Sequence, residues 1–214
     1  MIHIESFRFE NYNENTYVMY GKNRDCFIVD PGCYEYDEIE RIVHYIENSD
    51  LNPVGILVTH AHIDHIFGVT PLSELFKVKV YIQEKEYKVL LNMPKIGEGL
   101  GYRIDLFKGG HVFLNEDDTV KLDDNIVKVL FTPGHTQNSI SFYNDKSHLL
   151  ISGDVLFRNK IGKVTLPGGD YDTLIKTITE KLFVLPEHTI VYPGHGQPTT
   201  IGHEKENNKM EIWN

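Results

Sequence analysis

Apolar and polar positions alternate along the chain in a pattern that predicts many short strands and a few helices. Apolar residues at helical spacing predict helices over 36–46, 84–91 and 171–182. Short apolar runs closed by turn residues predict strands at 2–9, 15–20, 25–30, 54–58, 79–82, 126–131, 139–143, 148–151 and 189–192. Strands and helices alternate in two halves, which indicates an α/β layered sandwich with helices outside and sheets inside.

The chain length predicts one domain over residues 1–214, because this number of residues can bury a full hydrophobic core. The segment 92–110 has five glycines and no clear periodicity. Long connections of this kind are often functional, so the segment is either a lid over a site or a mobile surface excursion.

Composition narrows the range of partners. The formal net charge of -10 argues against a nucleic acid or an anionic membrane as the main partner, although acidity alone names no substrate. A small-molecule substrate is expected from the candidate chemistry below. The N-terminal residues contain neither a signal peptide nor a membrane span, so a cytoplasmic location is expected. Cys26 and Cys33 are too few for a disulfide scaffold. Whether the protein is a monomer or a homodimer stays open.

The densest chemical signal is the segment Thr59–His65, THAHIDH, which follows the apolar run VGILV. It places four metal-ligand side chains, His60, His62, Asp64 and His65, within six residues. Imidazole and carboxylate are the groups that Zn²⁺ and similar dications bind. If Asp64 and His65 begin the next helix, one segment serves two metal positions. A chance cluster of polar residues is the alternative, and this spacing disfavours it.

Three further turns have the same context, because each follows a predicted strand and contains small residues. They carry His135 in TPGHT, Asp154 in SGD and His195 in PGHG. Each motif alone is weak, since a Pro-Gly-His turn more often carries a solvated histidine. Together they are informative, because functional residues of layered α/β folds collect on loops at one edge of the sheets.

The order His-x-His-x-Asp-His, then a lone His, an Asp and a final His resembles the metallo-β-lactamase superfamily from about Asn15 to His195. The resemblance implies a four-layer αββα sandwich and two divalent metal ions, with zinc favoured and iron or manganese as alternatives. It implies that His60, His62 and His135 hold one metal ion, and that Asp64, His65 and His195 hold the second. Asp154 would bridge the two.

The full ligand set with Gly153-Asp154-Val155-Leu156-Phe157 is most similar to the glyoxalase II (hydroxyacylglutathione hydrolase) branch. Lys163 falls at the position of a lysine that contacts glutathione in that branch. Thr165 stands where the branch has a tyrosine, so the chain looks like a short, glyoxalase II-like form. Arg158 and Lys160 are further candidate anchors for an anionic substrate, with a solvated basic patch as the alternative.

The resemblance implies a metal-dependent hydrolase of acyl thioesters such as S-lactoylglutathione, with a metal-bridging hydroxide as the nucleophile. Asp64 is the candidate catalytic carboxylate, with an orienting or proton-handling role beside metal ligation. The alternative is a mononuclear iron persulfide dioxygenase, which resembles glyoxalase II and would use His60, His135 and Asp154. A metal-binding module without catalysis is disfavoured because no ligand is missing. Whether His203 faces the site stays open.

Overall fold

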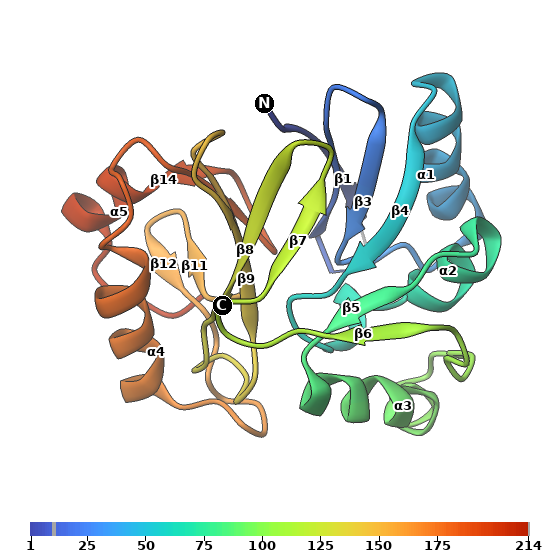
Figure 1. Ribbon diagram of the computed structural model, residues 1–214. Coiled ribbons are helices and arrows are strands. Elements are labelled where there is room, and N and C mark those ends of the chain that lie inside the picture. The colour runs from blue at the N-terminus through green and yellow to red at the C-terminus, as the bar shows by residue number, and fades with distance from the viewer. Residues whose placement is uncertain (10–11, 214) are drawn as a thin grey trace. The chain divides into compact units, whose positions relative to one another are not determined.

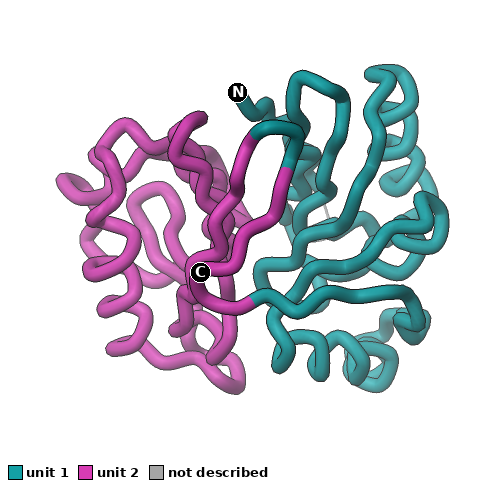
Figure 2. Tube along the Cα trace, in the orientation of Figure 1, with its two compact units in different colours: residues 1–114, 122–124 teal, residues 115–121, 125–214 magenta. Residues whose placement is uncertain are grey.

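The computed structural model of the protein describes residues 1–9 and 12–213. Its contacts divide the chain into two compact units, coloured separately in Figure 2. Unit 1 comprises residues 1–114 and 122–124, and unit 2 comprises residues 115–121 and 125–214. Each unit is built around one six-stranded sheet. The single domain over 1–214 stays a prediction.

The sheet of unit 1 has its six strands in chain order. The first three strands are antiparallel neighbours, and the third to sixth are parallel. Parallel strands need crossover connections, and three helices on one side of the sheet supply them (Figure 1). The strands are β1 (His3–Phe9), β2 (Glu14–Tyr20), β3 (Asp25–Val29), β4 (Asn52–Leu57), β5 (Val80–Ile82) and β6 (His111–Phe113), and the helices are α1 (Tyr36–Asn48), α2 (Val69–Phe76) and α3 (Glu84–Gly99).

The core of unit 1 forms where these helices meet the sheet. Ile56 of β4 is fully buried and shares one cluster with Ile42 and Ile46 of α1 and Leu72 of α2. Burying each such side chain stabilises the fold by roughly 1.5–3 kcal/mol. This packing anchors β4, and therefore the ligand-rich segment that follows it.

The helix predicted to end near residue 91 is longer than the sequence pattern indicated. Helix α3 continues through Pro94 to Gly99, because Met93 and Gly97 lie on its buried face and extend the apolar contact beyond the proline. Ile104 packs against Gly97, and Phe107 is buried in the core of unit 1. The first part of 92–110 therefore belongs to α3, and the rest is anchored at Gly97 and Phe107; the lid and the mobile surface excursion both stay predictions.

Unit 2 is built on a sheet with strand order β14-β13-β10-β9-β8-β7. Strands β10 and β13 are parallel neighbours, and Leu150 and Val191 on them pack against Leu174, Ile178 and Leu182. Helices α4 and α5 lie on one side of this sheet (Figure 1). The elements are β7 (Thr119–Leu122), β8 (Asn125–Phe131), β9 (Ile140–Asn144), β10 (Leu149–Gly153), β11 (Leu156–Phe157), β12 (Lys160–Ile161), α4 (Tyr171–Thr177), β13 (Ile190–Pro193), β14 (Thr199–Thr200) and α5 (Ile201–Asn207).

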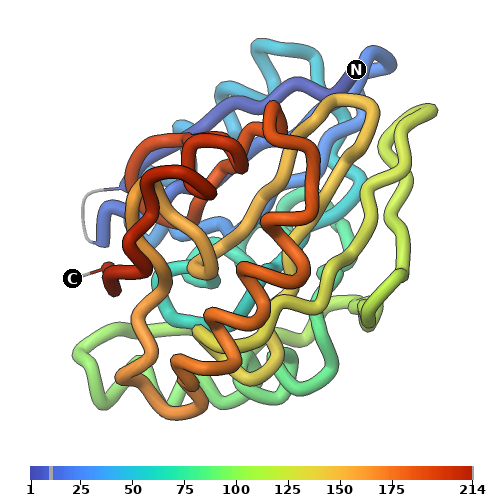
Figure 3. Tube along the Cα trace, turned by 90° about the vertical axis from the view of Figure 1, so that its left-hand side faces the viewer, coloured from blue at the N-terminus to red at the C-terminus, as the bar shows by residue number. Residues whose placement is uncertain are grey.

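All nine predicted strands are present within one or two residues of their predicted bounds. The helix predicted over 171–182 is α-helical to Thr177 and continues as a π-helical turn over Ile178–Leu182. Beyond α5, the chain runs back beside β12, with a parallel bridge between Ile161 and Ile212 (Figure 3). Among the described residues, none of the helices combines the length and the apolar character needed to cross a bilayer.

Candidate metal centre

In unit 1, the candidate ligands lie on the loop beyond the carboxyl end of β4. His60 and His65 are fully buried, while His62 and Asp64 are partly exposed. Asp64 and His65 lie in a 3-10 turn over Ile63–His65, and the next helix begins only at Val69. The expectation that they begin the helix is therefore wrong: this tight turn directs the two side chains before the helix starts.

Asp30, which the sequence analysis did not select, orients two of these histidines. Its carboxylate accepts hydrogen bonds from the Thr59 backbone N–H at 2.7 Å, the Thr59 hydroxyl at 2.5 Å and Nδ1 of His65 at 3.1 Å. Because the Thr59 proton is donated to Asp30, its oxygen accepts from Nδ1–H of His60, 3.0 Å away. Both rings thus keep the lone pair of Nε2 for a ligand.

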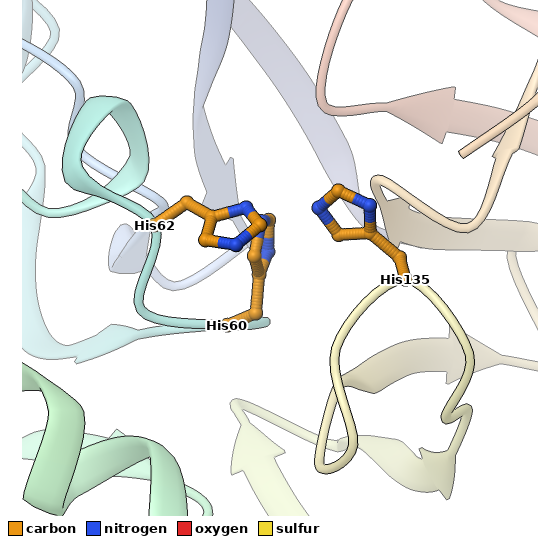
Figure 4. A group of neighbouring side chains, drawn as sticks. All are labelled: His60, His62 and His135. Atoms are coloured by element: carbon orange, nitrogen blue, oxygen red, sulfur yellow. The ribbon is translucent and has the colours of Figure 1, made fainter. Parts of the chain in front are cut away.

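His60 and His62 point their nitrogens at one position. Nε2 of His60 lies 3.1 Å from Nδ1 of His62, and the ring planes are 79° apart. Two ligands of one tetrahedral zinc ion are about 3.4 Å apart. Figure 4 shows these two rings side by side beyond β4, and also draws His135 on its own turn of unit 2.

Glu86 is a second residue that the sequence analysis missed. It lies in the first turn of α3, is 3% exposed, and accepts a hydrogen bond from the Ala61 backbone N–H at 2.8 Å. Ala61 stands between His60 and His62, so this bond fixes the backbone from which both rings project. The sequence offered one signal for Glu86, an acidic residue three positions after the helix N-cap Gln83. This signal indicates the start of a helix and does not indicate a hydrogen bond to the loop at Ala61.

Beneath Asp64 lies a buried carboxyl group, Glu14. A Cβ at Gly32 would lie 2.2 Å from Oε2 of Glu14 and 2.3 Å from the carbonyl oxygen of Asp64, so only glycine fits between them. Burial raises the pKa of Glu14 well above its ordinary value, and the hydroxyl of Thr16 contacts Oε2 at 2.9 Å. Among the described residues, Oε1 has no hydrogen-bond partner. Burial therefore favours the protonated form of the Glu14 carboxyl group.

An aromatic cluster borders Asp64 on the surface of unit 1. Phe67 packs against Tyr34 and Tyr102, with ring centroids 4.9 and 5.0 Å away, and Tyr12 lies 6.1 Å from Tyr102. Partial burial, a hydrogen bond with Tyr102 and the negative charge of Asp64 raise the pKa of Tyr12 to about 12. Tyr12 therefore stays protonated at neutral pH.

In unit 2, His135 is held by backbone contacts. It follows Gly134, which has φ +132 and packs against the backbone of Leu174, so a side chain at this position would clash. Nδ1–H of His135 donates to the carbonyl oxygen of Lys163 at 2.6 Å, which directs Nε2 outward. The residue before Lys163 is Gly162, which packs closely on Asp154. A Cβ at Gly162 would lie 1.9 Å from the Asp154 carbonyl oxygen, so only glycine fits there.

Asp154 and His195 meet because β10 and β13 are parallel neighbours that end at the same edge. Gly153 pairs with Pro193, and the Gly194 N–H donates to the Gly153 carbonyl oxygen at 2.9 Å. Oδ2 of Asp154 lies 3.6 Å from Nε2 of His135 and 3.5 Å from Nε2 of His195. One carboxylate oxygen thus faces two imidazole nitrogens at the spacing of metal ligands.

The candidate substrate anchors are exposed on unit 2. The side chains of Lys163 and Arg158 face solvent, and Nη1 of Arg158 donates to Oε1 of Gln197 at 3.3 Å. His203 lies in α5, and its Nε2 is 2.7 Å from Oδ1 of Asn159. Its ring therefore contacts the β11–β12 turn.

Known proteins share this sequence over most of its length. Residues 11–195 match the model of the metallo-β-lactamase superfamily. The chain is 37% identical to a probable metallo-hydrolase, YqgX, of Bacillus subtilis, covering 91% of this chain and 90% of the relative. It is 35% identical to the hydroxyacylglutathione hydrolase GloC of Haemophilus influenzae, covering 92% of each chain.

Solved structures share its fold. A crystal structure of BLEG-1 B3 metallo-beta-lactamase is 35% identical, with a TM-score of 0.87, and the match covers 97% of this chain and 98% of that one. A structure of TTHA1623 in a di-iron-bound form is 30% identical, with a TM-score of 0.84 and coverage of 96% and 98%. The α/β fold predicted from the sequence is confirmed. The chain belongs to the metallo-β-lactamase superfamily.

Proposed function

We propose that the protein is a binuclear metallohydrolase of acyl thioesters, with S-lactoylglutathione as the reference substrate. The main observation that supports a metal site is the position of Asp154, whose Oδ2 faces Nε2 of both His135 and His195 at 3.5–3.6 Å. The 35% identity to a hydroxyacylglutathione hydrolase supports the thioester class.

The donor set fits divalent metal ions. Three histidines of the set are oriented by hydrogen bonds to Nδ1, so that each offers Nε2 as a ligand. As the family resemblance implies, the proposal assigns one ion to His60, His62 and His135, a second to Asp64, His65 and His195, and the bridge to Asp154. Imidazole and carboxylate favour zinc, and the di-iron form of a 30% identical protein makes iron the first alternative.

Bound dications would polarise the thioester carbonyl and lower the pKa of a water molecule so that hydroxide is available near neutral pH. In the reaction a C–O bond forms from water, the C–S bond breaks, and the leaving thiolate takes a proton. Asp64, whose negative charge also acts on the nearby Tyr12, orients the attacking water and handles its proton. Lys163 and Arg158 bind carboxylates of the substrate.

The test is release of free thiol from S-D-lactoylglutathione by metal-free protein and by protein loaded with Zn²⁺, Mn²⁺ or Fe²⁺. We expect turnover only in the loaded samples. Asp154→Ala should bind fewer than two metal ions and lose activity by at least about 100-fold. Asp172→Ala, which removes an exposed aspartate from α4 of the same unit, is the matched control and should behave as wild type.

The same samples separate the competing functions. Oxygen uptake with glutathione persulfide at one iron per chain, without thioester turnover, would favour the persulfide dioxygenase. Hydrolysis of a β-lactam ring at a rate well above that of thioester hydrolysis would favour a β-lactamase activity, as the name of the similar BLEG-1 protein indicates for that protein. Full metal occupancy with none of these reactions would remove glutathione thioesters from the proposal.

A further inference from the structure

The segment beyond α5 pairs with β12 of the small β11–β12 hairpin of unit 2 through an isolated bridge between Ile161 and Ile212. The Ile161 N–H donates to the Glu211 carbonyl oxygen at 2.9 Å, and the Trp213 N–H donates to the Ile161 carbonyl oxygen at 2.8 Å. The side chain of Asn208 also donates to the Lys160 carbonyl oxygen at 3.0 Å. These bonds fix the backbone of Trp213, and the segment can be followed beside the hairpin in Figure 3.

The indole of Trp213 packs on the turn that carries His195. Gly196, the next residue, has φ +79, and a Cβ there would lie 2.9 Å from Cη2 of the indole, so both the backbone and the ring require glycine. Trp213 also packs on Phe157, with centroids 4.9 Å apart, and Phe157 lies 6.2 Å from His195. The indole thus lies one aromatic ring away from a candidate metal ligand, and it is partly exposed.

Two cations of the β11–β12 hairpin lie on the same part of unit 2. Nζ of Lys160 lies 6.0 Å from the indole centroid, and Arg158 of the same hairpin contacts Gln197, the residue after Gly196. In a chain with a net charge of -10, one cation near a partly exposed indole and a second cation on the same hairpin make a local surface that suits a group with both an apolar part and a carboxylate.

We propose that Trp213 is a specificity-determining residue that contacts the thiol portion of the substrate. The face of the indole takes the apolar part of a carboxylate-bearing thiol, and Arg158 and Lys160 pair with its carboxylates. This inference rests on the proposed thioester hydrolase function. Substrate selection would then depend on a segment near residue 213. Of the predicted metal ligands, only His195 is close to this segment in sequence.

Trp213 is the only tryptophan of the chain, so tryptophan fluorescence reports on this site alone. The first experiment titrates zinc-loaded protein with reduced glutathione, the expected product, while emission is recorded. We expect a saturable change in intensity or wavelength. Because this titration needs no turnover and no variant, it gives a readout independent of catalysis and of folding defects.

The second experiment measures S-D-lactoylglutathione kinetics on Trp213→Ala, Trp213→Phe and a control, Glu211→Ala, whose side chain is exposed in the same segment. Trp213→Ala should raise KM by roughly three- to tenfold while kcat changes less than about twofold. Trp213→Phe keeps a ring on Gly196 and should lie between it and wild type. The control should match wild type, and all variants should bind the same number of zinc ions.

The proposal requires both results. Unchanged emission with glutathione, or a wild-type KM in Trp213→Ala, would overturn it while leaving thioester hydrolysis intact. Absence of thiol release by wild-type protein with both metal ions bound is a different outcome: it would overturn the proposed function and, with it, the assignment of Trp213.

Discussion

The carboxylate of Asp30 accepts a hydrogen bond from Nδ1 of His65 at 3.1 Å and, through the Thr59 hydroxyl, also orients His60. Asp30 sits at φ +46 at the end of β3, where the chain turns into Pro31-Gly32. One residue outside the predicted ligand set therefore sets the tautomer of two members of that set.

Replacing Asp30 with alanine should weaken metal binding by roughly 10- to 100-fold, because His60 and His65 lose the acceptor that orients them. Competition against a chromophoric chelator measures the affinity. Asp37→Asn, an exposed aspartate in the first turn of α1, provides the control. Equal zinc affinity in Asp30→Ala and wild type would show that the orienting bond is dispensable.

Glu86 should be needed as a hydrogen-bond acceptor more than as a charge. Glu86→Ala leaves the buried Ala61 N–H without its acceptor and should lower the free energy of unfolding by about 1–3 kcal/mol. Glu86→Gln keeps an acceptor and should recover most of the loss. Urea unfolding of metal-free protein measures both, with Glu84→Ala as an exposed control expected within about 0.5 kcal/mol of wild type. Equal losses in the alanine and glutamine variants would contradict the acceptor role.

Glu14 predicts a dependence of stability on pH. Its pKa in the folded state is raised well above the ordinary 4.5, so the folded state holds the proton more tightly than the unfolded chain. The free energy of unfolding should therefore fall as pH rises above about 4.5, because the unfolded chain ionises first. Glu14→Gln should flatten this fall. Urea unfolding of metal-free protein between about pH 5 and 8 measures the slope; identical slopes in both proteins would argue against a neutral Glu14.

The sequence was informative about the strands and the ligand turns because both are local. Turn residues in the sequence mark the end of the run VGILV and the turn at His195. Parallel strands then bring their carboxyl ends to one edge of the sheet. Residues that act through another segment were missed. Glu86 looks like an ordinary helix-start acid, and Asp30 like the end of a strand, until the fold brings them to Ala61 and His65.

The end of the helix predicted over 84–91 was wrong for a related reason. Pro94 predicts the end of a helix, but the burial of Met93 and Gly97 carries α3 beyond it. No local pattern indicated that Trp213 would pack on Gly196, since 16 residues, including a helix, lie between them. Such contacts depend on tertiary packing, which overrides local propensity.

Gly134 should not tolerate a side chain. Its φ of +132 and the backbone of Leu174, 2.3 Å from a Cβ, oppose alanine independently. Gly134→Ala should lower the free energy of unfolding by at least about 2 kcal/mol. Gly99→Ala is the matched control, because a Cβ there meets nothing within 4 Å, and it should be neutral. Thermal unfolding compares the two variants, and equal melting temperatures would contradict the clash.

Lys163 has two separable roles, because its carbonyl oxygen holds Nδ1 of His135 while its exposed side chain is a candidate substrate anchor. Lys163→Ala keeps the backbone contact, so zinc stoichiometry should stay at the wild-type value. KM for S-D-lactoylglutathione should rise by roughly 3- to 30-fold, since a charge-assisted hydrogen bond to a carboxylate is lost. Lys146→Ala, an exposed lysine of the same unit, controls for net charge. Loss of zinc from Lys163→Ala would mean that the side chain is needed to place its carbonyl group. An unchanged KM with full zinc content would show that the Lys163 side chain does not bind substrate. The role of Lys163 would then be limited to the hydrogen bond between its carbonyl oxygen and His135.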